Sequence, residues 1–437
     1  MTPPTRHQSP PIPRIVTLSE IEEVVYTDIF AYRLLDAILD GYVSHSNGNF
    51  NAPPIQTMGA PPMAPFGGRT RRVGGGSGGG GAGGMGAKGG EDEDEDEEGR
   101  HTTYSAQTCV KSGYLTSSQH YVVKVASGGY PFPANSGNVQ LYSQDTGTLE
   151  AIFLDDGLLT ELRTAAAGAV AARLLMPKPP RVMDEGTRNG DRSRRCVGIV
   201  GTGTQARHQL RYLRYVTECR DVRVWGRTES NVNAFVNDMT EEGWNARAVH
   251  DVDDLLETCG LIVTTTSSRV PLLGRRWLVD RDRPDDDDCD NDDDHDDDDE
   301  RLRRRRRSHR GRRPLHVTCV GSDSTGKREL YDDFIAMADM LVADSRLQTA
   351  ERGEFEDVIR RGMVRIEDVI EIGELASRVE LHRGGGRDVG GGDDDDDDRE
   401  EDARLTIFDT SGMAVQDCVI ASMVYEALQR WNNDAPR

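Results

Sequence analysis

The sequence predicts an α/β protein in which a doubly wound domain with a parallel sheet is joined to a mixed α+β domain. The first observation is a glycine-rich turn at 201–206, which follows the β-branched run Cys196–Val200 and opens a helical pattern. The second is that apolar runs after this turn alternate with segments of helical period. The third is a group of strand-like runs between residues 105 and 153, which indicates an antiparallel or mixed sheet.

The mixed α+β domain is predicted at residues 15–180. Thr17-Leu-Ser-Glu20 has the pattern of a capping box, and the apolar period that follows indicates a helical start over 17–41. Residues 52–66 are apolar enough to form an ordered piece. Turn signals separate the strand-like runs, and an alanine-rich helix leads to the next domain. These elements are expected at Thr108–Leu115, Tyr121–Ala126 and Val139–Ser143 for the strands and Leu158–Leu175 for the helix.

The turn Gly201-Thr-Gly203-Thr-Gln-Ala206 has the composition of a dinucleotide-binding turn. Gly201 permits a tight turn, Gly203 lets the backbone approach a pyrophosphate, and Ala206 lets the helix pack closely on the strand. A lone GxGxxA motif is weak evidence, but its place between a strand and a helix predicts a Rossmann NAD(P)-binding domain at 190–350. The cofactor contacts expected here are Gly201, Gly203, Thr204, Gln205 and Ala206.

Five apolar runs after the turn alternate with helical segments, and the first three connections are predicted to be βαβ units. Thr266, directly after the third run, is a further expected cofactor contact. The chain from 351 to 437 is predicted to return to the first domain and complete it with an apolar-periodic helix over Met413–Leu428. The runs lie at Val222–Trp225, Ala246–Val249, Leu261–Thr265, His316–Val320 and Met340–Ala343.

The segment Trp225-Gly226-Arg227-Thr228 ends the second strand of the doubly wound domain. An Asp or Glu at this place normally accepts hydrogen bonds from the adenosine ribose, and here there is none. No carboxylate would therefore repel a 2′-phosphate, and Arg227 with the hydroxyl of Thr228 has the chemistry to bind one. The alternative is an exposed arginine that opens the next helix. The sequence favours NADP(H) over NAD(H).

The 437-residue chain has a net charge of −23, but most of this charge lies in low-complexity segments. The remainder is nearly neutral, so the charge says little about the substrate. An arginine-rich run at 301–313 directly follows an acidic run at 285–300, which neutralises it, so nucleic-acid binding is not expected. Biased segments bury too little apolar surface to offset their ordering entropy. Disordered insertions are expected at about 67–104, 281–314 and 384–403.

The seven cysteines are scattered and contain no CxxC pair. This pattern predicts a reducing compartment, no disulfide framework and no metal site. The N-terminal segment lacks the apolar core of a signal peptide, and no run approaches the ~20 apolar residues of a membrane span. We therefore expect a soluble, cytoplasmic protein.

Five sequence blocks stand in order along the chain, at Tyr121–Ser127, Leu159–Ala166, Gly198–Arg207, Gly321–Leu330 and Thr406–Asp417. In this order they resemble the ornithine cyclodeaminase/mu-crystallin family. With their flanks the blocks span most of the chain outside the low-complexity segments, which argues against coincidence. The resemblance implies a homodimeric, NAD(P)-dependent enzyme. Activities in the family are cyclodeamination of ornithine or lysine, reduction of cyclic ketimines and dehydrogenation of amino acids.

The resemblance assigns roles to three charged residues. Lys124, in a run of valines, is expected from its strand alone to extend to solvent, whereas the resemblance implies a catalytic lysine that contacts the substrate carboxylate. Arg163, otherwise a surface arginine or a partner of Glu161, is implied to grip the α-carboxylate with its planar fork. Asp323, which would otherwise cap a turn, is implied to be the acid/base that moves protons on the substrate nitrogen.

Three further residues are implied to contact the cofactor. Lys327 lies in the same loop as Asp323, Thr410 is a small hydroxyl residue near the nicotinamide, and Thr164 follows the implied substrate arginine. The loop also nearly matches the phosphate-binding motif GxxxxGK. Because Arg328 stands where a magnesium-binding hydroxyl is needed, a nucleoside triphosphatase is not expected.

Lys111 departs from the family pattern. The cyclodeaminase uses a glutamate thirteen residues before its strand lysine to hold the distal amine of ornithine, and counting back from Lys124 gives Lys111. An ammonium does not bind an ammonium, so this residue, as a substrate contact, disfavours ornithine and favours an apolar or acidic tail. The alternative is that Lys111 points away from the substrate.

The expected reaction is hydride transfer between NADP(H) and the C–N centre of a small amino or imino acid, as in a ketimine reductase or an amino-acid dehydrogenase. One alternative is a cyclodeaminase that forms proline from ornithine, or pipecolate from lysine, with release of ammonia. A second is a non-catalytic NADP-dependent binding protein, a role known in the mu-crystallin branch. A third is an interaction hub built around the charged insertions.

Overall fold

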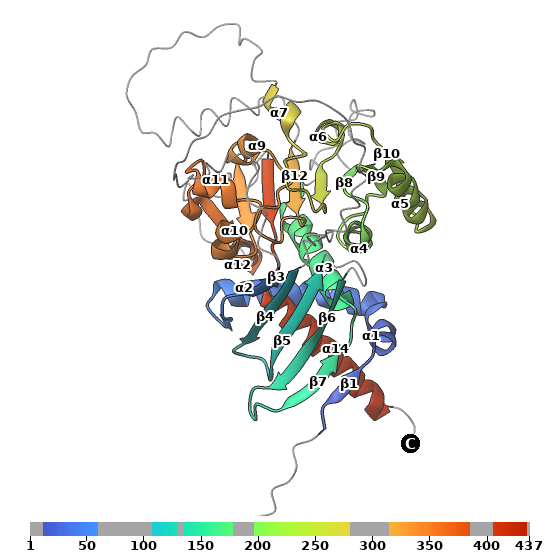
Figure 1. The fold of residues 1–437 in the computed structure, drawn as a ribbon, viewed down its shortest axis with the longest axis vertical. Coiled ribbons are helices and arrows are strands. Elements are labelled where there is room, and N and C mark those ends of the chain that lie inside the picture. Colours follow the sequence, from blue (N-terminus) through green and yellow to red (C-terminus); the bar gives the residue numbers. More distant parts are fainter. Residues whose placement is uncertain are drawn as a thin grey trace, which may run out of the picture.

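The computed structural model describes residues 12–59, 107–128, 135–177, 196–279, 314–384 and 405–434. Within these residues the chain forms two domains, each built on one sheet (Figure 1). The predicted α/β fold class, with one parallel and one mixed sheet, is confirmed. The insertions expected at 67–104, 281–314 and 384–403 lie outside the described residues, apart from Pro314 and Gly384 at their edges.

The parallel sheet has eight strands in the order β10 (Asn245–Ala248), β9 (Asp221–Trp225), β8 (Val197–Val200), β11 (Leu261–Thr264), β12 (Leu315–Cys319), β15 (Leu405–Asp409), β13 (Met340–Ala343) and β14 (Val369–Glu371). Side chains of β11 alternate between two buried clusters, Ile262 in one and Leu261 with Val263 in the other. Both faces of the sheet are therefore covered, as expected for a doubly wound fold. The glycine-rich turn leaves β8, where the strand order changes direction.

Helices and one 3-10 helix (η3) connect these strands. Their bounds are α4 (Thr204–Leu213), α5 (Glu229–Glu241), α6 (Asp254–Thr258), α7 (Arg275–Val279), α9 (Asp332–Ala336), α10 (Arg346–Glu351), α11 (Glu356–Arg360), η3 (Ile366–Asp368) and α12 (Ile372–Gly384). All five apolar runs predicted after the turn form strands, within a residue or two of the expected bounds.

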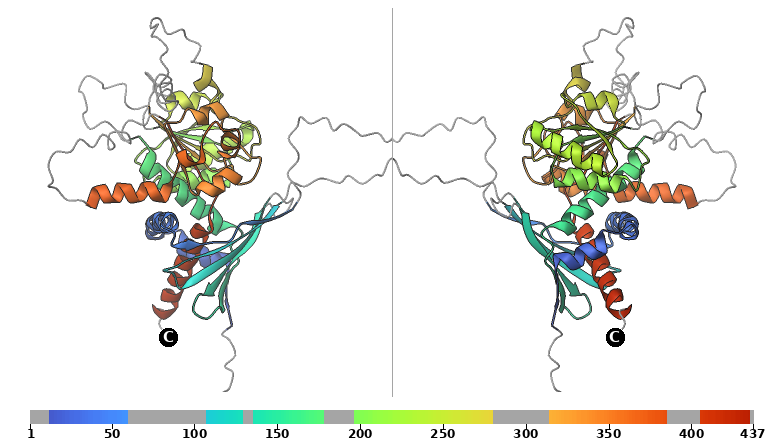
Figure 2. Two further views of the ribbon diagram at one scale, coloured as in Figure 1. Left: turned by 90° about the vertical axis from the view of Figure 1, so that its left-hand side faces the viewer. Right: turned by 90° about the vertical axis from the view of Figure 1, so that its right-hand side faces the viewer.

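The second sheet has the order β1 (Arg14–Val16), β7 (Leu149–Phe153), β6 (Asn135–Ser143), β5 (His120–Gly128), β4 (Gln107–Leu115) and β2 (Phe50–Asn51), and β3 (Gln56–Gly59) also pairs with β4. β1 runs parallel to β7, whereas the other pairs are antiparallel, so the sheet is mixed. Along β5, Val122 and Lys124 are buried while Tyr121 and Val123 are partly exposed. Figure 2 shows the reason: helices cover only one face of this sheet.

The covering helices are α1 (Leu18–Val25), α2 (Asp28–Ser46), α3 (Leu158–Leu175) and α14 (Ala414–Asp434). The capping box predicted at Thr17 and Glu20 is present. The helical start predicted over 17–41 is two helices, because Thr27 accepts a hydrogen bond from the amide of Phe30 (3.2 Å) and begins α2. The alanine-rich helix has the predicted bounds.

The end of the chain passes from one domain to the other. β15 inserts between β12 and β13 of the parallel sheet, and α14 then packs against α2, β4 and β5 of the other domain. The helix predicted over Met413–Leu428 is confirmed and continues to Asp434. Residues 410–413 therefore lie at the junction of the two domains.

Candidate active site

Helix α3 packs against α4, the helix that follows the glycine-rich turn. Gln205 Nε2 donates a hydrogen bond to the carbonyl oxygen of Glu161 (3.2 Å), and Gln209 Nε2 donates to the carbonyl oxygen of Thr164 (3.1 Å). These bonds involve the first turns of α3, which carry Arg163. The packing of α3 on α4 thus fixes Arg163 relative to the predicted cofactor-binding turn.

Small residues allow the two helices to approach closely. Ala165, Ala166 and Ala167 are fully buried, and a Cβ placed on Gly168 would lie 2.1 Å from Gln209 Oε1. A side chain at residue 168 would displace the Gln209 amide, which bonds to the carbonyl oxygen of Thr164. The hydroxyl of Thr164 donates to a carbonyl of its own helix (2.7 Å), so its contact with a cofactor stays a prediction.

The glycine-rich turn has the backbone geometry that a bound pyrophosphate needs. Gly201 has φ +110°, and a Cβ there would lie 2.7 Å from Thr265 Oγ1, so this position requires glycine. A Cβ on Gly203 would meet nothing within 4 Å, which leaves space next to the first amides of α4, where Thr204 is exposed. Ala206 is fully buried against the sheet. These residues fit an NAD(P) cofactor.

Arg227 and Thr228 are exposed where β9 ends and α5 begins. Thr228 is the N-cap residue of α5, but its side chain forms no capping hydrogen bond. Among the described residues, neither side chain has a hydrogen-bond or ion-pair partner. Both are therefore free to contact a ligand at this edge of the turn.

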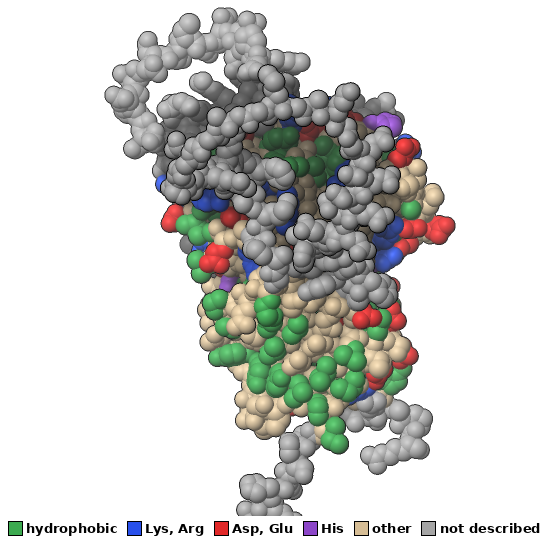
Figure 3. Space-filling model, in the orientation of Figure 1, with side chains coloured by type: hydrophobic (Ala, Val, Ile, Leu, Met, Phe, Trp, Pro, Cys, Tyr) green, Lys and Arg blue, Asp and Glu red, His purple; other side chains and the backbone are tan. Residues whose placement is uncertain are grey.

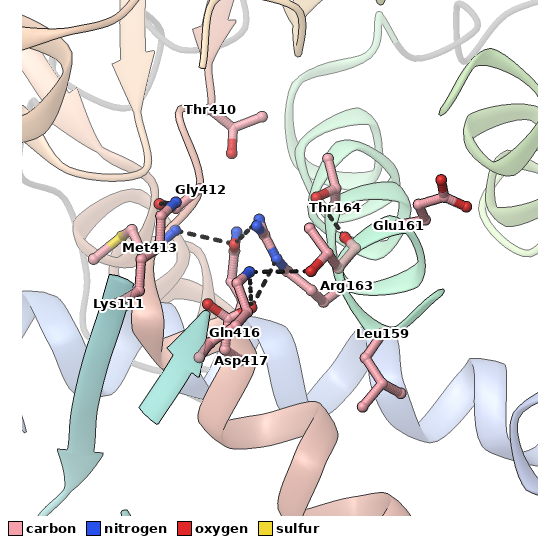
Figure 4. A network of polar contacts seen from close by, with 12 residues as sticks. Lys111, Leu159, Glu161, Arg163, Thr164, Thr410, Gly412, Met413, Gln416 and Asp417 are labelled. Atoms are coloured by element: carbon pink, nitrogen blue, oxygen red, sulfur yellow. Dashed lines mark hydrogen bonds and ion pairs between the residues drawn. The ribbon is translucent and has the colours of Figure 1, made fainter. Parts of the chain in front are cut away.

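Two cations of the mixed-sheet domain converge on one carboxylate at the start of α14 (Figure 4). Lys124 Nζ donates to Asp417 Oδ1 at 2.8 Å, and Arg163 Nε donates to the same oxygen at 3.1 Å. Arg163 Nη1 also donates to Gln416 Oε1 at 2.5 Å. Lys124 is 2% exposed and Arg163 4%. Lys124 therefore does not extend to solvent, and the partner of Arg163 is Asp417 rather than Glu161.

Lys111 belongs to the same cluster. It pairs directly with Lys124 across β4 and β5, and its Nζ donates to the carbonyl oxygens of Gly412 (2.7 Å) and Ser411 (3.5 Å). Its side chain is buried among these groups and points into the cluster, and its contact with a substrate stays a prediction. The structure thus brings together Lys111, Lys124 and Arg163, three of the predicted substrate contacts.

Burial and mutual charge control the ionisation of this cluster. Burial alone would raise the pKa of Asp417, but Lys124, Arg163 and Lys111 hold it below its usual value. Burial lowers the pKa of Lys124, and the charge of Asp417 opposes this effect. Burial, together with the charges of Arg163 and Lys124, lowers the pKa of Lys111 to about 7. Asp417 is therefore the group that keeps cationic side chains together in a buried site.

Three polar residues that support the cluster were not predicted from the sequence. Asp417 and Gln416 lie within a matched block but were not selected, and the side-chain amide of Gln416 donates in turn to the hydroxyl of Tyr42. Asp344 Oδ2 accepts from Thr410 Oγ1 and from the amide of Gly412, both at 2.9 Å. The one available signal was an Asp and a Gln within an otherwise apolar helix start.

Asp323 and Lys327 contact each other and form no described contact with the cationic cluster. They follow β12 in a loop, and Lys327 Nζ donates to Asp323 Oδ1 at 2.6 Å. The side chain of Asp323 is 57% exposed. No described backbone amide donates to it, so Asp323 does not cap the turn, and no described contact joins it to Lys124 or Arg163. The roles predicted for Asp323 and Lys327 stay predictions.

Buried Glu329 anchors this loop to the neighbouring strand. Its carboxylate accepts from Thr264 Oγ1 (2.6 Å), the amide of Thr266 (2.6 Å) and the amide of Gly321 (3.0 Å). Burial and the charge of nearby Glu354 raise the pKa of Glu329 to about 7. Thr266 and Gly321, at the ends of adjacent strands, are thereby held together by a single carboxylate.

A sequence profile of the ornithine cyclodeaminase/mu-crystallin family matches residues 132–280 and 313–432 of this chain. The chain belongs to this family. Among its relatives, an uncharacterized cyclodeaminase of Sinorhizobium fredii is 30% identical over 324 residues, covering 72% of this chain and 79% of that protein. The iminosuccinate reductase of Paracoccus denitrificans is 28% identical over the same length and coverage.

The family fold is also seen in solved structures. An archaeal alanine dehydrogenase dimer with bound NAD superposes with a TM-score of 0.63 at 21% identity, covering 96% of this chain and 97% of that one. Within the described residues, no group of three or more His, Cys, Asp or Glu side chains is arranged to hold a metal ion. No helix in that part of the chain has the length and apolar character to cross a membrane.

Proposed function

We propose that this member of the ornithine cyclodeaminase/mu-crystallin family is an NAD(P)-dependent oxidoreductase acting on the C–N centre of an amino or imino acid. The most suitable reactions are ketimine reduction and amino-acid dehydrogenation. The observation that carries the proposal is the position of Arg163. This residue and Lys124 share one buried carboxylate, and the helix that bears Arg163 packs directly on the cofactor-binding turn.

In the proposed reaction, some residues bind the substrate and another moves a proton. Arg163 and Lys124 bind the substrate α-carboxylate and so orient the adjacent carbon. When bound, NAD(P) accepts a hydride from that carbon or returns one to it. In the oxidative direction the C–H bond breaks as a C=N bond forms, and the nitrogen loses a proton, which Asp323 accepts and passes to solvent. In the reductive direction Asp323 returns the proton to nitrogen.

The names of the relatives support this choice of chemistry, since they include a reductase and a dehydrogenase. Ornithine cyclodeamination is the second candidate, because one relative is named a cyclodeaminase. Lys111 argues against ornithine, since its buried ammonium would lie where the distal amine has to bind. A binding protein without activity is the third candidate, and the retained Lys124, Arg163 and Asp323 argue against it.

The deciding experiment supplies purified protein with NADPH and a six-membered cyclic ketimine carboxylate, and follows the loss of NADPH absorbance. Turnover that collapses in the Asp323→Asn variant is the expected result. Absence of turnover by protein that demonstrably binds NADPH would contradict imine reduction. Release of ammonia from ornithine would then support the cyclodeaminase, and its absence would favour the binding protein.

Arg227 is proposed to select NADP(H). No carboxylate stands at the end of β9, and the Arg227 guanidinium is exposed there without a partner among the described residues. Arg227→Ala should therefore raise KM for NADPH by about 10- to 100-fold, the range for a lost charge-assisted contact. KM for NADH should change little, because NADH has no 2′-phosphate. An equal change in KM for NADPH and for NADH in steady-state kinetics would show that Arg227 does not bind the 2′-phosphate.

A homodimer is proposed through the open face of the mixed sheet. Figure 3 shows apolar side chains gathered on this face. They include Val123, Val125 and the stacked pair Tyr121 and Tyr142, whose ring centroids are 4.8 Å apart. Light scattering should give the mass of two chains, and Val123→Arg should give the mass of one. A monomeric wild-type protein would contradict this interface.

A further inference from the structure

Two cations beside the proposed α-carboxylate site have no carboxylate partner among the described residues. Lys111 is 8% exposed, and its Nζ is held by the carbonyl oxygens of Gly412 and Ser411. Asp417, whose charge acts on Lys111, is already bound by Lys124 and Arg163. The ammonium of Lys111 is therefore solvated by peptide groups and not by an anion.

Arg352 is the second of these cations. Its amide donates to the carbonyl of Gln348 (2.9 Å), and the side chain of Gln348 donates to the same Gly412 oxygen that Lys111 binds (2.9 Å). The end of α10 is thus joined to Lys111 through one carbonyl. The Arg352 guanidinium has no hydrogen-bond or ion-pair partner in the described part of the chain. Its charge is among those that, after burial and the charges of Arg163 and Lys124, lower the pKa of Lys111.

Asp344 does not compensate this excess of positive charge. Its carboxylate accepts from Thr410 Oγ1, from the amide of Gly412 and from the amide of Ser345. Burial raises the pKa of Asp344, and the charge of Lys111 opposes this effect, but no described hydrogen bond or ion pair joins the two side chains. The charges of Lys124, Arg163 and Arg352 thus act on Lys111, and a monocarboxylic substrate bound there brings one negative charge.

We propose that Lys111 and Arg352 form a second anion subsite that binds the side-chain carboxylate of a dicarboxylic amino or imino acid. The inference rests on the proposed function, because it assumes that Lys124 and Arg163 bind the α-carboxylate. Lys111 favours a substrate with an acidic or an apolar side chain over ornithine. Of these two, we favour the acidic one, because an apolar side chain would bury the Lys111 amine without a partner. An acidic tail supplies the missing charge at the buried Lys111 ammonium, and the charge of Arg352 at the end of α10 adds to its attraction.

The test compares kcat/KM for L-aspartate and L-glutamate with that for L-asparagine and L-glutamine, using NAD(P)⁺. Each amide matches its acid in shape and lacks the charge. The acids should be preferred, and Lys111→Met and Arg352→Gln should each lower the acid-to-amide ratio by about 10- to 100-fold. Lys124→Met is the matched control. It should lower kcat/KM for both the acids and the amides and leave the acid-to-amide ratio unchanged. Arg352→Gln changes a partly exposed residue, so it keeps the test valid if Lys111→Met fails to fold.

A binding measurement separates this proposal from the reaction. Succinate has two carboxylates and no reactive nitrogen, so it should raise the Tm of the wild-type protein more than butyrate does, and Lys111→Met should remove the difference. One outcome would overturn the subsite but leave the proposed function in place. In that outcome the enzyme turns over ketimines but prefers the amides, and neither Lys111→Met nor Arg352→Gln changes its acid-to-amide ratio. Absence of all turnover by protein that binds NAD(P)H, with equal effects of succinate and butyrate, would overturn the subsite and the proposed function together.

Discussion

Asp417→Asn should destabilise the fold by about 3–5 kcal/mol and lower kcat/KM by roughly 100-fold or more, the range for breaking a buried ion pair. The variant leaves Lys124 and Arg163 buried without their shared anion, although Asn keeps the shape of the side chain. Denaturant unfolding and steady-state kinetics measure the two effects. Glu426→Gln on the same helix is the control, because its partner Arg430 is exposed and such pairs contribute little.

Asp417→Asn should also change how stability and activity depend on pH. Because the folded pKa of Asp417 lies below its unfolded value, the wild-type protein gains stability above the unfolded pKa and loses it as the pH falls through the folded one. Asp417→Asn should lack this part of the acid dependence. At alkaline pH, activity should fall as Lys124 loses its proton, and without Asp417 that fall should begin at lower pH, since Asp417 raises the pKa of Lys124.

If the role of Asp417 were purely structural, its replacement would not shift the alkaline limb of the pH profile of kcat/KM. A variant that is less stable but keeps the wild-type pH profile of kcat/KM would therefore assign Asp417 to packing alone. Unchanged stability would contradict the charge argument itself, because it would mean that the two cations do not need a counter-ion in the folded state.

Local patterns predicted the parts of the fold that are set by residues near in sequence. The turn at Gly201 needs a positive φ and sits between a strand and a helix, so its sequence alone specifies it. The helix Leu158–Leu175 was predicted with its observed bounds, because its alanine-rich period is unbroken. The break at Thr27 was missed, since a capping threonine within an apolar period looks like an ordinary helical residue.

The site depended on contacts that a single sequence does not reveal. Asp417 contacts residues 254 and 293 positions earlier in the chain, and the apolar helix start around it does not indicate which residues would be its partners. The same limit explains β15, which enters the parallel sheet between strands far from it in sequence. The strand pattern predicted that Lys124 extends to solvent, which its burial shows to be wrong, while the substrate contact implied by the resemblance stays a prediction.

The second large effect is expected from Asp323→Asn, which should lower kcat by about 10²- to 10⁴-fold, the usual contribution of a general acid/base. Binding of NAD(P)H, measured by fluorescence titration, should stay close to wild type, because Asp323 contacts neither the glycine-rich turn nor Arg227 among the described residues. Asp251→Asn is a suitable control. It removes a similarly exposed carboxylate of the same domain, 48% exposed against 57%, from an ion pair with Arg276.

The position of Asp323 makes this a demanding test. In the structure its carboxylate is paired with Lys327 and exposed, whereas the cations proposed to bind the substrate are buried on the other domain. Proton transfer therefore requires the loop anchored by Glu329 to face that cluster. Retained activity in Asp323→Asn would remove it from the reaction.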